Sequence, residues 1–545
     1  MSTRFSREVL YLVAGSALLL AAPVLQIARE NLSSLIWYDF WVTLLVMVGA
    51  PGLLIALLAV LFPNRIGLAA AVGLTFWLST YNREMDAVVR DMDLPVVGEV
   101  GFVTVLLLLF FPVLLVALAL LPRSLIASAI GATGLALFVL AAVELMLSED
   151  IGELLEPAID GTVLIDPNPL SESEPGQASG RLPDIIYIVP DRYGNSGVLA
   201  DEFQHDNGEF LDALRQRGFA VADEARANYL ATPFSLASSM NMQYLEPVLQ
   251  RLDGETTRAW PLYSLFQDNL VTARLKRMGY RYVHVPSWWD GTMHSAQADL
   301  TVDFWVWSWV GEFGVKAVQQ SPLVEMAIAS IYPTDMCAAL KRQLAFLENA
   351  GGGDRPTFVF AHVLAPHSPI LMDAEGRCVD GLDYPRRPKD GTWEAYKEGY
   401  SGFLSYLNNR LLEIFDRQKV NNPNPLIFVL QADEGPYPKA FREQNAIVRG
   451  GGARGEGFDW REASDAQLAM KFGILNALYL GGPDGPEALP DVPEALTPVN
   501  NWRVIFGHLE GKTYPLLPDR HFIYLSYTEP YNSIEITEHL KAIAR

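Results

Sequence analysis

Three carboxylates stand directly after two short apolar runs of the sequence. Asp191 follows residues 184–190, and Asp433 and Glu434 follow residues 426–432. Both runs are rich in β-branched and large apolar side chains, which is typical of strands buried on both faces of an α/β sheet. Such sheets bind their ligands beyond the carboxyl ends of their strands. The carboxylates are therefore candidate ligands of one metal ion, with an acidic turn that closes a strand as the alternative interpretation of Asp433 and Glu434.

Thr232 is the candidate nucleophile. It precedes Pro233 and an apolar stretch, a pattern that predicts a helix start with Thr232 as the N-cap, and a purely structural cap is the alternative interpretation. A hydroxyl at a helix N-terminus lies where free N–H groups and the helix dipole stabilise an anion, such as a phosphoryl group on that oxygen. A bound cation that lowers the hydroxyl pKa would make Thr232 a nucleophile. Together with the three carboxylates, Thr232 completes an all-oxygen ligand set, which favours Mn²⁺ or Mg²⁺ over Zn²⁺.

Two histidines cluster at the end of a third apolar run, residues 357–365. His367 is the candidate to contact a phosphate or to protonate a leaving alkoxide. His362 is either a substrate contact or a packed core histidine. Trp289 and His294, which follow another predicted strand, are candidates for the wall of a substrate pocket. Plain burial of the tryptophan is the alternative interpretation there.

The elements that must position these side chains belong to an α/β domain over residues 181–545. The spacing of apolar residues predicts helices over 198–217, 324–331 and 335–350, and a strand over 471–480. Strands that alternate with helices indicate a mainly parallel sheet with helices on both faces. The candidate site then lies at the carboxyl edge of that sheet.

The N-terminal part of the chain is apolar enough to cross a membrane several times. A membrane-spanning helix needs about 20 apolar residues. Five stretches satisfy or approach this length: residues 9–28, 40–62, 66–81, 100–121 and 124–143. Arginines 4, 7, 65 and 123 fall on one side of such a bundle, which predicts that this side is cytoplasmic. We therefore expect a transmembrane domain over 1–147, a linker over 148–180 and an exported domain over 181–545.

Net charge and cysteine content further limit the possible partners and the redox state of the chain. The formal net charge of −22 excludes nucleic acid as a partner, because nucleic-acid binding needs a basic surface. The chain has two cysteines, Cys337 and Cys378, both in the predicted exported domain. The sequence gives no geometry that would decide between a disulfide and two free thiols.

These motifs, in this order, resemble those of the alkaline-phosphatase-like superfamily, and most of all its membrane branch of lipoteichoic acid synthases and lipid A phosphoethanolamine transferases. The strand ending in Asp191 is similar to the family's first metal-ligand strand, and Thr232-Pro-Phe-Ser-Leu to its nucleophile segment. Pro-His367-Ser-Pro resembles its substrate-contacting histidine segment. Asp433-Glu434-Gly stands where the family has Asp-His-Gly, so a metal-binding histidine is replaced by a carboxylate. The formylglycine signature Cys-x-Pro-x-Arg of sulfatases does not occur, which argues against sulfate-ester hydrolysis.

The resemblance implies an N-terminal five-helix transmembrane bundle followed by an exported α/β alkaline-phosphatase-like domain, in a bacterial cytoplasmic membrane. It implies a metal-dependent transferase that moves a phosphoryl-linked head group, of phosphoglycerol or phosphoethanolamine type, from a phospholipid donor to an envelope glycan or lipid acceptor through a phosphothreonine. Two alternatives stay open. One is a phosphodiesterase or phosphatase of the same superfamily, and the other is an envelope scaffold whose site has decayed, with Glu434 as the sign of decay.

Overall fold

The chain folds into two compact units, one of which contains two separate segments. The structure is a computed structural model that describes residues 3–32, 35–62, 65–81, 102–148, 151–152, 159–170, 181–305, 311–329, 336–382, 392–449, 458–482, 485–486, 493–526 and 529–543. Unit 1 comprises Met1–Pro157 and Val306–Thr334, and unit 2 comprises Ala158–Trp305 and Asp335–Arg545. Each unit is described by itself.

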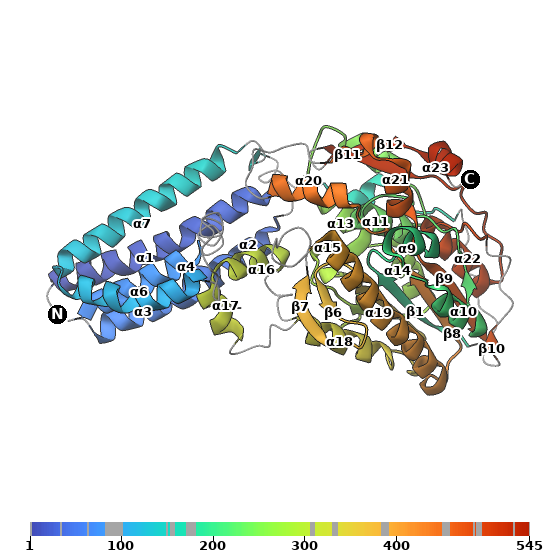
Figure 1. Cartoon of the computed structure of the whole chain (residues 1–545), viewed down its shortest axis with the longest axis horizontal. Coiled ribbons are helices and arrows are strands. Elements are labelled where there is room, and N and C mark those ends of the chain that lie inside the picture. Colours follow the sequence, from blue (N-terminus) through green and yellow to red (C-terminus); the bar gives the residue numbers. More distant parts are fainter. Residues whose placement is uncertain are drawn as a thin grey trace. The chain divides into compact units, whose positions relative to one another are not determined.

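Unit 1 is a bundle of apolar helices. Its helices are α1 (Thr3–Glu30), α2 (Trp37–Leu44), the π-helical turn η2 (Leu45–Gly49), α3 (Ala50–Leu61), α4 (Ile66–Ser79), α6 (Phe102–Ala119), α7 (Arg123–Met146), α16 (Gly311–Gln320) and α17 (Pro322–Ala329) (Figure 1). In the described residues, three helical stretches are long and apolar enough to cross a membrane: Arg7–Glu30, Trp37–Leu61 and Arg123–Met146. The other two predicted spans correspond to shorter apolar helices, so the count of five spans is not confirmed.

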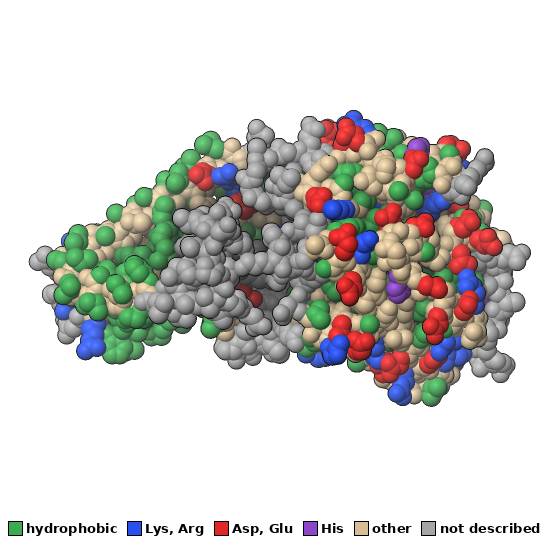
Figure 2. Space-filling view, viewed as in Figure 1, with side chains coloured by type: hydrophobic (Ala, Val, Ile, Leu, Met, Phe, Trp, Pro, Cys, Tyr) green, Lys and Arg blue, Asp and Glu red, His purple; other side chains and the backbone are tan. Residues whose placement is uncertain are grey.

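The surface of unit 1 differs from that of unit 2 in kind. Hydrophobic side chains cover much of the visible face of the α1, α3, α6 and α7 bundle, whereas acidic and basic side chains are spread over unit 2 (Figure 2). Large apolar side chains such as Leu45, Val116 and Leu120 are more than 60% exposed. Exposed apolar patches of this extent mark a surface that contacts lipid or another apolar partner.

The boundary of unit 1 departs from the ranges expected from the sequence. The segment with α16 and α17 interrupts the α/β domain, yet its apolar side chains pack in the bundle. Phe313 lies 6.2 Å from Phe40, and Ser321 and Ser79 share a hydrogen bond of 2.6 Å. From the sequence alone, such a helix is placed in the same domain as the segments next to it in the chain. Apolar periodicity shows which face of a helix is buried, but not which element packs against that face.

Unit 2 is built around an eight-stranded sheet. Its strands are β1 (Asp184–Pro190), β2 (Ala220–Val221), β3 (Arg281–Val285), β4 (Leu300–Thr301), β5 (Thr357–Val363), β8 (Leu426–Gln431), β9 (Asn476–Gly482) and β10 (Gly485–Pro486). Among the described residues the order is β10-β9-β8-β1-β5-β3-β4, and β2 pairs with β9. The pairs from β8 to β4 are parallel, and β9 is antiparallel to β8. The predicted mainly parallel α/β sheet is confirmed.

Two further two-stranded sheets and the helices complete unit 2. The small sheets pair β6 (Ile370–Met372) with β7 (Cys378–Leu382) and β11 (Phe522–Ser526) with β12 (Glu529–Glu535). The helices are η4 (Gly161–Leu164), α9 (Ser196–Phe203), α10 (Gly208–Gln216), α11 (Thr232–Asn241), α12 (Glu246–Leu252), α13 (Trp260–Gln267), α14 (Leu270–Arg277), α15 (Asp290–Met293), α18 (Met336–Leu347), α19 (Trp393–Asn421), α20 (Lys439–Arg449), η5 (Trp460–Glu462), α21 (Asp465–Phe472), α22 (Pro498–Glu510) and α23 (Thr537–Ile543). A disulfide joins Cys337 of α18 to Cys378 of β7.

Helices cover both faces of the sheet. On one face Trp502 of α22 packs edge-on against Tyr187 of β1, at 5.6 Å between ring centroids. On the other face Phe415 of α19 packs against Phe428 of β8, at 5.5 Å. Side chains alternate between the two faces of a strand, and helices cover both faces here. Every residue of β1 is therefore buried, which explains why its sequence does not alternate between apolar and polar residues.

Two predicted elements have different bounds in the structure. The helix expected over 198–217 is two helices, α9 and α10, because Gln204 adopts a left-handed backbone with φ of 51° that ends α9. The strand expected over 471–480 begins only at Asn476. A capping box at Ser464 starts helix α21, and this helix includes Lys471.

Candidate functional site

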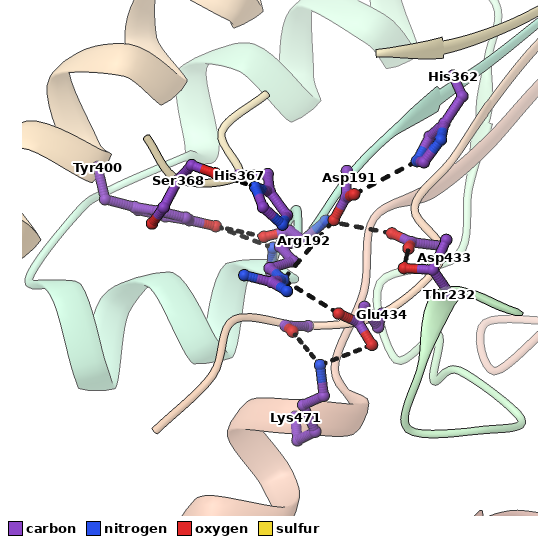
Figure 3. A network of polar contacts seen from close by, with 12 residues as sticks. Asp191, Arg192, Thr232, His362, His367, Ser368, Tyr400, Asp433, Glu434 and Lys471 are labelled. Atoms are coloured by element: carbon purple, nitrogen blue, oxygen red, sulfur yellow. Dashed lines mark hydrogen bonds and ion pairs between the residues drawn. The ribbon is translucent and has the colours of Figure 1, made fainter. Parts of the chain in front are cut away.

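The carboxyl ends of β1, β5 and β8 meet at one edge of the sheet and carry the candidate site. These three strands are adjacent and parallel, with Val189 of β1 opposite His362 of β5. Asp191, His362 and Asp433 each offer one ligand atom, and these atoms lie within 4.8 Å of one another (Figure 3). All three side chains are buried. The structure thus brings together Asp191 and Asp433, which are more than 240 positions apart in the sequence.

The donor atoms of this cluster fit a cation. Asp191 Oδ1 and His362 Nε2 are buried and have no hydrogen-bond partner among the described residues. Nε2 lies 3.4 Å from Asp191 Oδ2. Buried polar atoms without partners are costly, and two of them facing a common point are what a metal ion satisfies. The residues present therefore fit a divalent cation.

The second nitrogen of His362 is held from behind. Nδ1 lies 2.9 Å from the Thr292 hydroxyl, which lies 2.6 Å from the Ser287 hydroxyl. When Nδ1 carries the proton and donates it to Thr292, the Nε2 lone pair is left for a metal, as is usual for ligating histidines. This tautomer is an assignment from the hydrogen-bond network.

His362 changes the expected metal preference. The sequence predicted an all-oxygen set that included Glu434, and therefore Mn²⁺ or Mg²⁺ over Zn²⁺. The cluster instead combines two carboxylates with an imidazole, which is a common zinc ligand. A preference for Mn²⁺ or Mg²⁺ over Zn²⁺ is thus not supported.

Thr232 lies beside the cluster, at the first turn of α11. Its hydroxyl donates a hydrogen bond of 2.5 Å to Asp433 Oδ2. Ala231, not Thr232, occupies the N-cap position, and no side chain caps the helix. The purely structural interpretation of Thr232 required a bond from its oxygen to the helix backbone. In the structure the hydroxyl is directed at Asp433 instead.

Glu434 is placed differently from the other predicted ligands. Its Oε1 accepts a hydrogen bond of 3.0 Å from Arg192 Nε, and its Oε2 lies 2.8 Å from Lys471 Nζ. Both oxygens of this buried carboxylate are thus directed at cations of the protein (Figure 3). The structure gives Glu434 the position of a counter-ion, because two basic side chains occupy the space around it.

His367 lies next to Asp191 and Arg192 in the site (Figure 3). It is flanked by the cis peptide bonds Ala365–Pro366 and Ser368–Pro369, and its Nδ1 contacts the carbonyl oxygen of Ser368. Burial and the nearby Arg192 charge lower its pKa to about 3. His367 is therefore neutral near pH 7, which suits the predicted contact with a phosphate, and its role as a proton donor stays a prediction.

The two candidate pocket residues separate in the structure. Trp289 packs edge-on against the His362 ring, with 5.8 Å between centroids. Trp288 packs in the same manner against His367, at 6.1 Å. Each tryptophan is partly exposed, so the pair borders the site. His294, at the end of α15, is exposed and makes no described contact with the metal-ligand candidates.

The charges of the site are strongly coupled. Burial raises the pKa of Asp433 well above its ordinary value, and the carboxylates of Asp191 and Glu434 add to the effect. For Asp191 burial acts in the same direction, but the His367 and His362 rings and the Arg192 guanidinium outweigh it and hold its pKa below the ordinary range. Burial lowers the pKa of Lys471 to about 7, against the attraction of Glu434.

Arg192, Lys471 and Thr292 are site residues that the sequence did not single out. An arginine directly after Asp191 was the available signal for the first, since a charged residue at a buried strand end is unusual. Lys471 lies between Met470 and Phe472, and a lysine in an apolar segment is a weak signal of a buried partner. Thr292 carried no signal, because only tertiary structure brings it to His362.

No protein-family model matches the sequence, and no curated protein matches it. Among solved structures, the chain is similar to the C-terminal periplasmic domain of EcEptC from Escherichia coli, with 11% identity and a TM-score of 0.42 over 66% of this chain and 94% of that one. It is also similar to the integral membrane protein lipooligosaccharide phosphoethanolamine transferase A from Neisseria meningitidis, with 11% identity and a TM-score of 0.39 over 93% and 96% of the two chains. A putative sulfatase from Bacteroides fragilis has 13% identity and a TM-score of 0.34 over 65% and 82%.

By their names, these similar structures include a phosphoethanolamine transferase and a putative sulfatase. Identity and TM-score are low in every pair.

Proposed function

We propose that the protein is a membrane-anchored phosphotransferase that forms a phosphothreonine on Thr232. One observation carries the proposal: the Thr232 hydroxyl donates to Asp433, whose carboxylate belongs to the buried cluster that fits a cation. A hydroxyl held at the edge of such a cluster is in the position of a nucleophile. Two buried ligand atoms that lack a hydrogen-bond partner among the described residues, Asp191 Oδ1 and His362 Nε2, argue against a decayed site.

The residues of this chain supply the steps as follows. Thr232 Oγ1 attacks the phosphorus of a phospholipid head group, and its proton passes to Asp433 Oδ2, the acceptor of its hydrogen bond. The bond from phosphorus to the lipid oxygen breaks, and that oxygen takes a proton from water. An acceptor hydroxyl then attacks the phosphothreonine and gives its proton to the hydroxide left from that water, and the released Thr232 oxygen takes its proton back from Asp433. His367 hydrogen-bonds to the group in transit, and Trp288 and Trp289 border it.

The cation would be held by Asp191, His362 and Asp433, with Thr232 as a further oxygen. A divalent cation at this position lowers the pKa of a nearby hydroxyl and stabilises negative charge on phosphoryl oxygens. Zinc, manganese and magnesium are all candidates, because the imidazole suits zinc and the carboxylates suit manganese and magnesium.

Membrane anchoring favours a lipid donor and transfer over hydrolysis. The apolar helices of unit 1 keep the chain at a bilayer, where phospholipid head groups are concentrated. The arginines at positions 4, 7, 65 and 123 predict that unit 2 lies outside the cell, and the disulfide between Cys337 and Cys378 agrees with an oxidising compartment. The donor would be a phospholipid, and the acceptor a glycan or lipid of the bacterial envelope.

The proposal is tested by substituting Thr232. Thr232→Ala removes the oxygen that carries the group, so we expect turnover of a labelled phospholipid and the covalent adduct to be lost together. Thr232→Ser keeps a hydroxyl and should keep a measurable adduct at a reduced rate. Intact-mass spectrometry of the full chain detects the adduct, and its mass identifies the transferred group.

Metal content is the control for these variants. Thr232→Ala should still bind about one cation per chain in elemental analysis, because Asp191, His362 and Asp433 remain. Full turnover in metal-loaded Thr232→Ala would sink the mechanism. A wild-type protein that releases the head group at the same rate with and without an envelope glycan would favour the hydrolase alternative.

A further inference from the structure

Arg192 is fixed at its backbone although no step above uses it. Its N–H donates to Asp433 Oδ1 at 3.2 Å, and its carbonyl accepts from the Tyr400 hydroxyl at 2.7 Å. Its φ of 61° lies in the left-handed region, which is unfavourable for a residue with a side chain. Such a conformation persists only where the surroundings hold it, often at functional sites. The position of Arg192 is therefore set before any ligand binds.

The side chain of Arg192 is held as firmly as its backbone. Nε donates to Glu434 Oε1 at 3.0 Å, and the guanidinium carbon lies 4.3 Å from the centroid of the Tyr437 ring. Lys471 Nζ lies 3.3 Å from the same centroid and pairs with the other oxygen of Glu434. Arg192 and Lys471 thus both face Glu434, and Arg192 Nε also lies 3.8 Å from Asp191 Oδ1.

The outer end of the guanidinium is available. Across the part of the chain that the structure describes, Nη1 and Nη2 have no hydrogen-bond or ion-pair partner, and the side chain is 19% exposed. In Figure 3 this end points away from Glu434, on the side where His367 lies. Two terminal N–H groups in a fixed fork match two oxygens of a phosphate.

We propose that Arg192 binds the substrate's phosphate group through Nη1 and Nη2 and holds it for attack by Thr232. One carboxylate links the two residues, because Asp433 accepts from the Arg192 N–H with Oδ1 and from the Thr232 hydroxyl with Oδ2. Glu434 and Lys471 then act as positioning residues that aim the guanidinium. That the anion is a phosphate rests on the proposed function. The alternative is that Arg192 only neutralises Glu434.

Titration of the full chain in detergent with inorganic phosphate tests the assignment without requiring turnover. We expect Arg192→Gln to raise the Kd for phosphate by about 10- to 100-fold, the range for loss of a charged, two-pronged hydrogen bond. Arg192→Lys keeps the charge and the pairing with Glu434 but loses the fork, so its Kd should lie between the two. If Arg192 only neutralised Glu434, Arg192→Lys would bind phosphate like the wild type.

A matched control is Arg217, which pairs with Asp416 through Nε and Nη2 at 2.8 and 2.7 Å in an exposed position. Arg217→Gln should leave the Kd unchanged. Wild-type affinity in folded Arg192→Gln, or no saturable phosphate binding by the wild type, would overturn the proposal. Thr232→Ala should keep phosphate binding. Lack of transfer by a protein that binds phosphate through Arg192 would therefore count against the phosphothreonine mechanism alone.

Discussion

At the scale of single residues, Glu434 shows how one position can keep its place in a motif and change its partners. By motif it stands where a metal-binding histidine is found in the family that the sequence resembles. In the structure Arg192 and Lys471 bind its carboxylate, and His362 of β5, on the other side of β1, supplies the nitrogen of the candidate metal cluster. Motif order therefore predicted the residues of the site better than it predicted their roles.

His284 should make stability depend on pH on the acid side of neutrality. Tyr282 donates to its Nδ1 and its Nε2 donates to the Thr292 carbonyl, an arrangement that holds the neutral ring, and burial lowers its pKa to about 4. Between the folded-state pKa of about 4 and the unfolded-state pKa of about 6.5, the unfolded state binds a proton on His284 and the folded state does not. We expect the unfolding free energy to fall by about 1.5 kcal/mol from pH 6.5 to pH 5 through this residue.

Thermal unfolding of the full chain across this pH range measures the effect. His284→Gln keeps a side-chain donor for the Thr292 carbonyl but has no proton to gain. Its melting temperature should change less with pH than that of the wild type. Equal slopes for the two proteins would mean that His284 does not titrate in this window.

At the scale of elements, the sequence predicted β1, β5 and β8 and the side chains at their ends because buried parallel strands have a strong local signature. It did not predict the packing of α16 and α17 in unit 1, because an apolar helix face does not show which element it packs against. It missed Arg192 and Lys471 for a related reason. A buried ion pair forms between residues far apart in the sequence, so neither local sequence reveals it.

The crossing of α1 and α7 depends on small residues. A Cβ atom at Gly134 would lie 2.1 Å from the carbonyl oxygen of Gly15, so the two helices touch backbone to backbone there. Gly134→Ala forces them apart, and we expect it to lower the unfolding free energy by about 1–3 kcal/mol. Gly52→Ala in α3 is the control, because a Cβ there meets nothing within 4 Å. Equal melting temperatures of the two variants in detergent would contradict the close crossing.

At the scale of the whole molecule, the side of the membrane on which unit 2 lies depends on whether the number of crossings is odd or even. Three long apolar helices and the two shorter ones give three or five crossings, and both numbers are odd. Either count places the C-terminal unit opposite the N-terminus. The proposed exported site therefore holds when α4 and α6 both cross the bilayer or neither does, and a crossing by one of them alone would reverse it.

Introduced cysteines measure this topology, because both native cysteines are joined in a disulfide. Asp201 on α9 and Arg65 before α4 are exposed. With a membrane-impermeant maleimide we expect Asp201→Cys to react in intact spheroplasts and Arg65→Cys to react only after permeabilisation. The reverse pattern would place unit 2 in the cytoplasm and remove envelope acceptors from consideration.

The disulfide also ties the completion of the fold to its location. Cys378 begins the second strand of the hairpin β6–β7, which follows directly after the segment with His367, and Cys337 anchors it to α18. Thiols stay reduced in the cytoplasm, so this hairpin is covalently secured only after unit 2 reaches an oxidising compartment. Newly made chains would then form this bond on the far side of the membrane, next to the segment that carries His367.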